Sequence, residues 1–251
     1  METRKLRILC LHGIYNNIEV MQYQLDYYMY IFRDYIDFEI INAPFVYEHV
    51  FDPVVKEKFK GPFYGWYAID FEKKRRIKVR EGIEYLINYI NDNGPFDGLL
   101  GFSQGSILAR IILKREEFGS LLPKLAVDPP KFAILFSSVV SKLSNPTTKD
   151  KEFYDILTGK YEEPILFIYG EQEISEDTVS ESIINTCNIT TIVHNGGHYV
   201  PKFVNKEMSI FGNFIKDRYF ELIGTNMDVD VDHIKEDFKE QYKLSKLKSK
   251  I

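Results

Sequence analysis

The sequence lacks the features that mark disulfide-bonded, zinc-binding, membrane-spanning and secreted proteins. Its 251 residues include only two cysteines, Cys10 and Cys187. Each lies in or beside an apolar segment and their spacing fits no zinc site, so we expect two buried, reduced thiols rather than a disulfide or a metal centre. No run of about 18 apolar residues is present, which predicts that no transmembrane helix forms. The apolar run Ile8 to Leu11 is too short for a secretory signal.

A basic surplus is also missing. The formal net charge is −5, and no concentration of Lys and Arg occurs before the last few residues. Nucleic acid is therefore not expected as the main partner. Hydrophobic residues make up 45% of the chain and charged residues 27%, as in an ordinary soluble globular protein. These features predict a cytoplasmic protein with one large core.

Short apolar runs predict the fold class. Runs that are apolar on both faces are typical of parallel strands covered on both sides by helices. Apolar positions at helical spacing occur between them, from Val79 to Ile90 and from Val204 to Ile215. We expect an α/β fold, a doubly wound and mostly parallel sheet with helices on both faces, in a single domain over residues 1–224. The strand-like runs are Ile8–Leu11, Phe38–Ile41, Leu99–Phe102, Phe132–Phe136, Ile165–Tyr169 and Thr190–Val193.

Residues 225–251 differ in composition and predict a charged, helical C-terminal extension. Its start resembles a calcium loop, but His233 and Lys239 stand where that loop needs Gly and Glu, so an acidic turn is expected instead. The chain ends Ser-Lys-Ile, one residue away from the peroxisomal signal Ser-Lys-Leu. Peroxisomal import is therefore an alternative to the cytoplasmic location.

The segment GFSQG, residues 101–105, fits the pattern G-x-S-x-G. Ser103 follows a strand-like run and precedes a helical pattern over residues 104–114, with small residues in its first turn. A nucleophilic serine at a sharp strand-to-helix turn needs this setting, and glycines at 101 and 105 avoid clashes where strand and helix meet. The alternative is a glycine-rich turn in which Ser103 only caps the helix.

A nucleophilic serine needs a base, and His198 is the favoured candidate among five histidines. It follows two glycines in the loop after the last predicted strand. His194 ends that strand and is expected to pack or hydrogen-bond locally. His12 is interpreted as a loop former, and His49 and His233 as surface residues.

The acid that orients the base should follow a strand between the serine and the histidine. Three carboxylates follow the strand that ends near Gly170: Glu171, Glu173 and Asp177. Glu173 is favoured, and Asp177 could instead cap a helix. For the oxyanion, we expect backbone N–H groups of Gln104 and of Ile14, in the loop after the first strand. Tyr15, Tyr64 and Trp66 are candidates to line an apolar acyl pocket, with core or rim packing as the alternative.

The order of these segments resembles the FSH family of serine hydrolases, which includes the fungal FSH proteins and the ovarian cancer-associated gene 2 protein. The resemblance runs from residue 6 to about 220 and rests on LHG (11–13), NAP (42–44), GPFYGWY (61–67), GPFDGLLGFSQG (94–105) and GGHYVP (196–201). It implies an α/β-hydrolase fold, with Ser103 as nucleophile, His198 as base and residue 173 as acid. The family usually has Asp at this last position and Val-Pro soon after it, where this chain has Glu173 and Ser175-Glu-Asp.

Together these features predict a serine hydrolase that cleaves carboxylic esters or thioesters with an apolar acyl group, through an acyl-enzyme and without a cofactor or metal. Two alternatives remain open. One is a lipid hydrolase similar to acyl-protein or lysophospholipid thioesterases. The other is an inactive relative that acts as a binding module, for which the Glu at position 173 is the only indication.

Overall fold

The computed structural model describes residues 4–48, 50, 52–70, 75–138, 160–173, 188–204 and 206–229. Its centre is a six-stranded sheet of order β10-β9-β8-β7-β1-β2, in which every neighbouring pair is parallel. This confirms the predicted fold class, and each predicted run forms one strand. The strands are β1 (Leu6–Leu11), β2 (Ile36–Ile41), β7 (Gly98–Phe102), β8 (Ala133–Phe136), β9 (Ile165–Gly170) and β10 (Ile189–His194).

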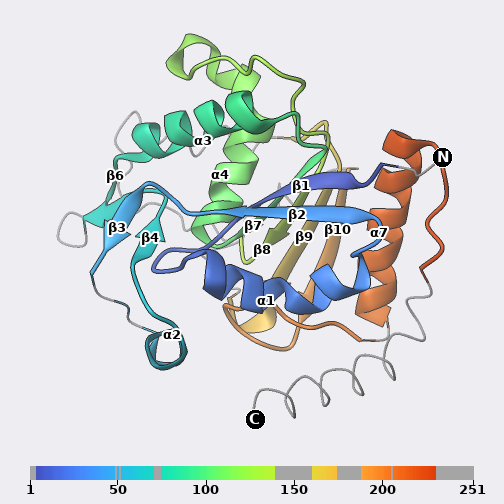
Figure 1. Cartoon of the computed structure of the whole chain (residues 1–251), viewed down its shortest axis with the longest axis horizontal. Coiled ribbons are helices and arrows are strands. Elements are labelled where there is room, and N and C mark those ends of the chain that lie inside the picture. The colour runs from blue at the N-terminus through green and yellow to red at the C-terminus, as the bar shows by residue number, and fades with distance from the viewer. Residues whose placement is uncertain are drawn as a thin grey trace.

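Helices cover both faces of the sheet (Figure 1). One core cluster joins the sheet to α3 (Val79–Asn93) and α4 (Gln104–Leu113), and the other joins it to α1 (Ile18–Ile31) and α7 (Lys206–Ile223). Successive residues of a strand point to opposite faces, so both kinds of position must be apolar. In β1, Leu9 packs with α3 and α4 while Cys10 packs with α1 and α7.

Helix α3 forms at the first of the two predicted helix patterns. α3 buries Ile83, Leu86, Ile87 and Ile90, and the N–H of Gly94 donates to Ile90 O just after its last residue. Helix α1 was not predicted, although Asn17 caps it by accepting a hydrogen bond from Val20 N at 3.0 Å. No helix in the described ranges is both long and apolar enough to cross a membrane.

The strand order places a crevice at a defined point of the sheet. β1 pairs with β2 on one side and with β7 on the other, so the chain builds outward in both directions from β1. In open α/β sheets, ligand sites form beyond the carboxyl ends of the strands where the order reverses. Leu11 pairs with Gly101 at the ends of β1 and β7, so the loops that follow the two strands lie side by side.

Two small hairpins outside the main sheet were not predicted. β3 (Phe45–Tyr47) pairs antiparallel with β4 (Phe63–Gly65), with the short helix α2 (Pro53–Lys58) between them, and β5 (Ala68–Asp70) pairs with β6 (Arg75–Ile77). Backbone bonds between Asn16 and Tyr64, at 2.7 and 3.3 Å, attach the first hairpin to the loop after β1. This places β4 next to the crevice.

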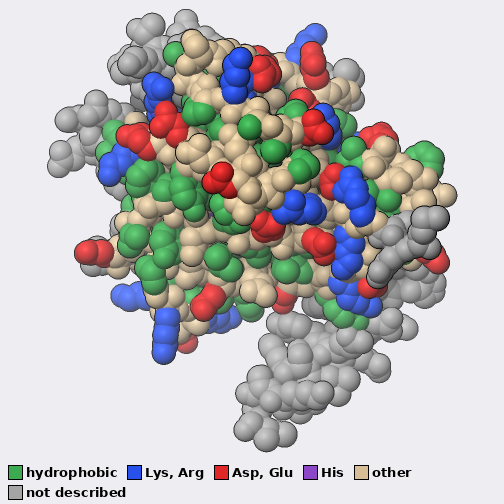
Figure 2. Space-filling model, turned by 45° about the horizontal axis from the view of Figure 1, so that its top comes forward, with side chains coloured by type: hydrophobic (Ala, Val, Ile, Leu, Met, Phe, Trp, Pro, Cys, Tyr) green, Lys and Arg blue, Asp and Glu red, His purple; other side chains and the backbone are tan. Residues whose placement is uncertain are grey.

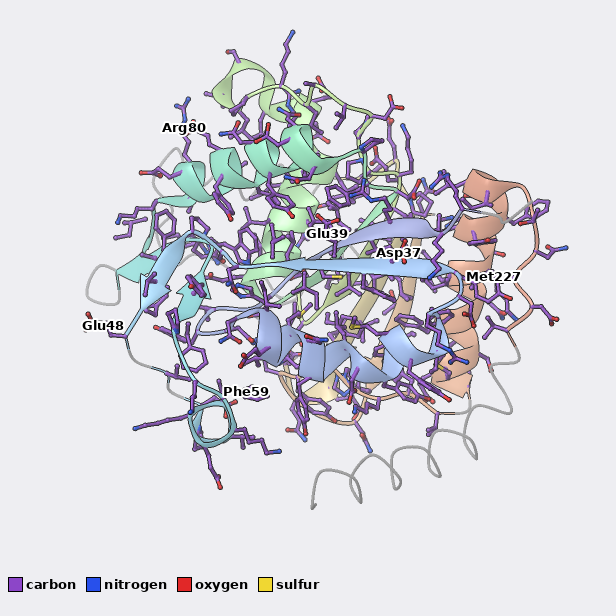
Figure 3. All side chains as sticks on the ribbon, viewed as in Figure 1. Asp37, Glu39, Glu48, Phe59, Arg80 and Met227 are labelled. Carbon is purple, nitrogen blue, oxygen red and sulfur yellow. The ribbon has the colours of Figure 1, made fainter. Side chains whose placement is uncertain are left out.

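Charged side chains limit further pairing at the β2 edge of the sheet. Asp37 and Glu39 project from this edge strand (Figure 3), and Lys5 and Arg7 pair with them at 3.4 and 3.0 Å. Such charges discourage another chain from adding to the sheet. Elsewhere, Lys and Arg are interspersed with Asp and Glu over the face seen in Figure 2.

The sequence-predicted extension begins shortly after α7 ends at Ile223. Most of it, including the Ser-Lys-Ile end, lies outside the described residues, as do Cys187, His49 and His233. Cys10 is a free, fully buried thiol whose pKa is raised by burial. This agrees with the reduced thiol expected for that cysteine.

Candidate active site

Ser103 stands at a strained turn between β7 and α4. Its backbone has φ 53° and ψ −116°, a conformation that is rare for a residue with a side chain. A Cβ added at Gly101 would come within 2.4 Å of Ser106 Cα, and one at Gly105 within 2.1 Å of Leu11 O. Both glycines are therefore required by backbone packing, as the sequence predicted. Although Ser103 is the residue before α4, its side chain makes no capping hydrogen bond.

The Ser103 hydroxyl instead contacts His198. Ser103 Oγ lies 2.9 Å from His198 Nε2, and His198 Nδ1 lies 2.5 Å from Glu173 Oε1. If Nδ1–H donates to the carboxylate, Nε2 is free to accept the serine proton. The structure thus brings together the three residues that the sequence singled out, from the ends of three different strands.

Glu173 is held by donors from two strand ends. It lies in a 3-10 turn, Glu171–Glu173, directly after β9. Its second oxygen, Oε2, accepts the Gly170 N–H at 2.8 Å and the Ser137 hydroxyl at 3.0 Å. Burial raises the pKa of Glu173, but the bonds from His198, Gly170 and Ser137 outweigh this and lower it below its usual value. The carboxylate is therefore ionised at neutral pH.

The acid turn and the histidine loop are tied to each other. Gln172 N donates to Gly196 O at 3.1 Å, and a Cβ at Gly170 would come within 2.2 Å of that same oxygen. Farther along, Tyr28 on α1 donates to Pro201 O at 2.5 Å. The loop that carries His198 is therefore fixed at both ends.

The loop after β1 lies against the turn at Ser103. A Cβ at Gly13 would come within 3.3 Å of Ser103 Cβ, so the two segments are in close contact. Within the described residues, the backbone N–H groups of Ile14 and Gln104 donate no hydrogen bond. Free N–H groups at a helix start and in an adjacent loop are suited to stabilising negative charge.

The candidate pocket residues have different surroundings. Tyr15 and Tyr64 are partly exposed, and Tyr15 has φ 57° and packs edge-on against Tyr47 at 4.8 Å between ring centroids. Trp66 is fully buried in the core and its indole N–H donates to His12 O at 2.8 Å. The structure places Trp66 beneath the loop after β1, in the packing position that was the alternative to a pocket wall.

Of the other candidates within the described residues, His194 and Glu171 form no hydrogen bond with Ser103 or His198. His194 ends β10, accepts the Gly196 N–H at 3.2 Å and packs against Tyr199, as expected. Glu171 is exposed on the turn that carries Glu173. Asp177 lies outside the described residues. Among the described residues, no group of three or more His, Cys, Asp or Glu side chains could hold a metal ion.

Sequence reasoning missed contacts that depend on distant segments. Ser137, at the end of β8, has φ 50° and bonds to Glu173, and Tyr47 reaches Tyr15 from the β3–β4 hairpin. His12 is a fully buried ring with two hydrogen bonds rather than a simple loop former. Burial lowers the pKa of His12 to about 4, so the ring is neutral. A signal for Ser137 was its place directly after a strand of the sheet.

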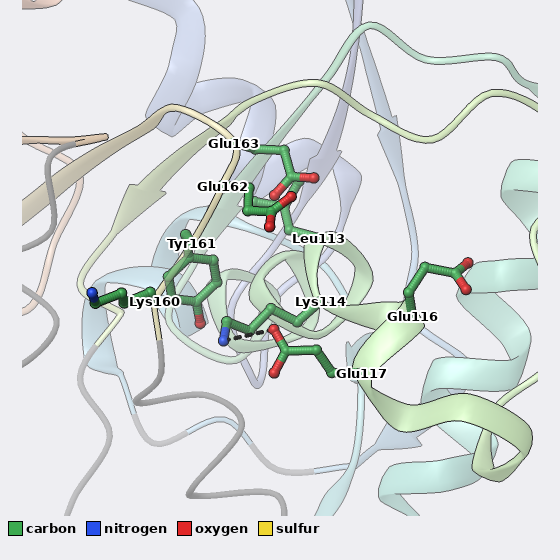
Figure 4. Close-up of a pocket in the computed structure, with 8 residues that line it drawn as sticks. All are labelled: Leu113, Lys114, Glu116, Glu117, Lys160, Tyr161, Glu162 and Glu163. Carbon is green, nitrogen blue, oxygen red and sulfur yellow. Dashed lines mark ion pairs between the residues drawn. The ribbon is translucent and has the colours of Figure 1, made fainter.

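A separate cavity of about 300 Å³ lies at the far end of α4 (Figure 4). Lys114 follows the last residue of α4, whereas Ser103 precedes the first, so the cavity and the Ser103 site lie at opposite ends of this helix. A Lys114–Glu117 ion pair of 2.9 Å occupies part of it. Its lining is mostly charged: Leu113, Lys114, Glu116, Glu117, Lys160, Tyr161, Glu162 and Glu163.

The parallel sheet covered on both faces and the strained serine between strand and helix define the class: an α/β hydrolase. The solved structure of acyl-protein thioesterase 2 from Zea mays has the same fold, with a TM-score of 0.53 over 86% of this chain and 95% of that one. Identity between the two is 17%, so this likeness concerns the fold alone.

The chain belongs to the serine hydrolase (FSH1) family, whose model matches residues 1–210. Among curated relatives, Esterase CG5412 of Drosophila melanogaster is 32% identical over 236 residues, which span 88% of this chain and 77% of the relative. Esterase C25G4.2 of Caenorhabditis elegans is 29% identical over 238 residues, 88% of this chain and 98% of the relative. The family resemblance seen in the sequence is therefore confirmed, and the protein is a serine hydrolase.

Proposed function

We propose that this protein hydrolyses carboxylic esters or thioesters with an apolar acyl group, by acyl transfer to Ser103 and then to water. The observation that carries the proposal is the chain of contacts from Ser103 Oγ through His198 to Glu173, at 2.9 and 2.5 Å. Nucleophile, base and orienting acid need this order and these distances. The proposed reaction calls for no cofactor or metal.

In the first half-reaction Ser103 Oγ attacks the acyl carbon while His198 Nε2 takes the hydroxyl proton. The Ile14 and Gln104 N–H groups donate to the oxyanion of the tetrahedral intermediate. When the intermediate collapses, the bond from the acyl carbon to the leaving oxygen or sulfur breaks. His198 then gives its proton to that leaving group, and an acyl-enzyme remains.

Water completes the cycle along the same path. His198 Nε2 takes a proton from water as the water oxygen adds to the acyl carbon. Collapse breaks the bond to Ser103 Oγ, which regains the proton from His198, and a carboxylic acid leaves. Through both halves the Glu173 carboxylate keeps Nδ1 protonated and stabilises the imidazolium.

Several features support an ester or thioester with an apolar acyl group. Relatives over most of the chain are named esterases. Tyr15 and Tyr64 present partly exposed aromatic surface beside the Ile14 donor. The Phe102 ring packs against the His198 ring, with 5.2 Å between the ring centroids. Aromatic surface beside the proposed oxyanion donor favours an apolar acyl group over a charged one.

The test is a panel of p-nitrophenyl esters (butanoate, octanoate, palmitate) and a palmitoyl thioester. Turnover is measured for the wild type, Ser103→Ala and Ser120→Ala, a surface control on the 3-10 segment after α4. We expect Ser103→Ala to lower kcat by about 10⁴ or more and Ser120→Ala to leave it unchanged. A folded wild type that cleaves none of these compounds, or an active Ser103→Ala, would contradict the proposal.

A further inference from the structure

The two proposed oxyanion donors are held in different ways. Gln104 N–H belongs to the peptide unit whose carbonyl is Ser103 O. That oxygen accepts from Ser106 N at 3.1 Å and from Ser106 Oγ at 2.6 Å, so it points into α4. In a trans peptide the N–H points opposite to the C=O. The Gln104 N–H therefore points away from α4, and the helix itself fixes its direction.

Ile14 has no helix or strand to hold it, because it lies in the loop after β1. Its N–H shares a peptide unit with Gly13 O. His12 Nδ1 lies 2.7 Å from Gly13 O. The His12 ring therefore holds this peptide through its carbonyl, on the side opposite to the Ile14 N–H. Turning the Gly13–Ile14 peptide would break that bond and turn the Ile14 N–H away from the oxyanion.

The His12 ring is itself fixed in one tautomer. Ala43 N donates to His12 Nε2 at 3.0 Å, so Nε2 carries no proton. The proton must then lie on Nδ1, where it is donated to Gly13 O. The side chain is fully buried, and loss of either bond would leave an unsatisfied polar group in the core.

Trp66 and the Gln104 side chain connect the two donors. Trp66 Nε1 donates to His12 O at 2.8 Å and so holds the preceding peptide of the loop. Trp66 N in turn donates to Gln104 Oε1 at 2.9 Å, and Gln104 Nε2 donates to Tyr67 O at 3.0 Å. The side chains of His12, Trp66 and Gln104 are all buried. The hydrogen bonds form a path from one donor peptide to the other.

We infer that His12, braced by Trp66, is a positioning residue that aims the Ile14 N–H at the oxyanion. The inference rests on the proposed function, since it concerns the transition state of that reaction. Neither side chain touches the substrate. Their effect is on the barrier of the chemical step, because the oxyanion forms after the substrate has bound.

Two conservative replacements separate this role from core packing. In His12→Asn the amide nitrogen takes approximately the place of Nδ1 and keeps the donor to Gly13 O. In His12→Gln the amide reaches the place of Nε2, so the acceptor for Ala43 N–H is kept and that donor is lost. We expect His12→Asn to keep kcat within about threefold of the wild type. His12→Gln should lower kcat about 10- to 30-fold with KM unchanged. This loss is smaller than the roughly 10²- to 10³-fold loss of kcat that follows when an oxyanion donor is removed entirely.

A second readout uses an alkyl trifluoromethyl ketone, whose adduct with the serine carries an oxyanion. Its affinity should fall across the variants by the same factor as kcat/KM, while that of the product carboxylate stays constant. Ile215→Val changes a core residue of α7 and reports how a loss of stability far from the site affects the rate. Circular dichroism corrects every rate for the folded fraction. If His12→Gln does not fold, Trp66→Phe serves in its place with the same expected loss in kcat. It removes the bond to His12 O together with part of a fully buried ring, and the folded-fraction correction and Ile215→Val account for the lost packing.

Equal kcat for His12→Asn and His12→Gln, or unchanged affinity for the ketone, would overturn the inference. If Trp66→Phe is used, a kcat equal to that of Ile215→Val has the same meaning. Ser103→Ala is measured alongside. If it remains active, the proposed function fails; if it is inactive while the His12 variants are equal, the positioning role alone fails.

Discussion

Replacing Glu173 with Gln should almost abolish turnover, because of how the carboxylate is bonded. Oε2 accepts two donors, Gly170 N–H at 2.8 Å and Ser137 Oγ at 3.0 Å, whereas Oε1 faces His198 Nδ1 at 2.5 Å. In the Glu173→Gln variant the amide oxygen must take the Oε2 position, since an NH₂ group there would face the Gly170 N–H. The NH₂ group then faces Nδ1.

An NH₂ donor beside His198 Nδ1 selects the tautomer protonated at Nε2. That nitrogen lies 2.9 Å from Ser103 Oγ and could no longer take its proton. In serine proteases the corresponding acid-to-amide change lowers kcat by about 10⁴, which is about 5 kcal/mol of barrier. We expect a loss of about 10³–10⁴ in kcat for Glu173→Gln with little change in KM.

Glu173→Asp tests reach separately from charge. It keeps the carboxylate but shortens the side chain by about 1.5 Å, one carbon–carbon bond. The right tautomer remains available, so a smaller loss of about 10- to 100-fold is expected.

The assay is p-nitrophenyl butanoate hydrolysis near neutral pH. Glu171→Gln serves as the control, because Glu171 is an exposed acid on the same turn. Its activity should equal that of the wild type. A Glu173→Gln variant within about tenfold of the wild type would refute Glu173 as the orienting acid, given the loss that the tautomer change should cause. Asp177→Asn would then be the next variant to measure.

Three further predictions concern stability and reactivity. Gly105→Ala should lower the free energy of unfolding by about 3 kcal/mol or more, since the new Cβ would lie 2.1 Å from a backbone oxygen. Gly119→Ala should lower it by only about 1 kcal/mol, because the new Cβ enters open space and the cost comes from the φ of 51° alone. Urea unfolding measures both changes. Burial lowers the pKa of His12 to about 4 from about 6.5 in the unfolded chain, so the unfolded chain binds the extra proton between these values. Stability should therefore fall by about 3 kcal/mol as pH drops through that window, and His12→Asn should lack this component. Cys10 should resist iodoacetamide until the protein unfolds, because burial raises the pKa of its thiol; peptide mapping checks this, and rapid native alkylation would contradict it.

The sheet could be predicted from the sequence because its signal is local. Every strand of a covered parallel sheet is an apolar run, and each of the six runs forms a strand. The strands of the hairpins are only three residues long, which is too short for a pattern to distinguish them from loops. Helix α1 could have been found from Asn17 and the spacing of Val20, Leu25 and Tyr28, but its many tyrosines weaken the contrast between its two faces.

The site was predictable where chemistry and chain order restrict it, and not where it depends on long-range contact. Ser103 and His198 each follow a strand and lie within two residues of glycines, which marks both as loop residues at one edge of the sheet. The role of His12 depends on Ala43 and Trp66, which lie 31 and 54 residues away. Whether Glu173 reaches His198 depends on a turn that no local pattern specifies.

An activated Ser103 is the central claim, and reaction with a fluorophosphonate tests it most directly. Intact mass should show one adduct on the wild type, peptide mapping should place it on Ser103, and Ser103→Ala should gain none. His198→Ala should react more slowly by about 10² or more, because the base is lost. A folded wild type that gains no adduct, or one that carries it on another residue, would contradict the account.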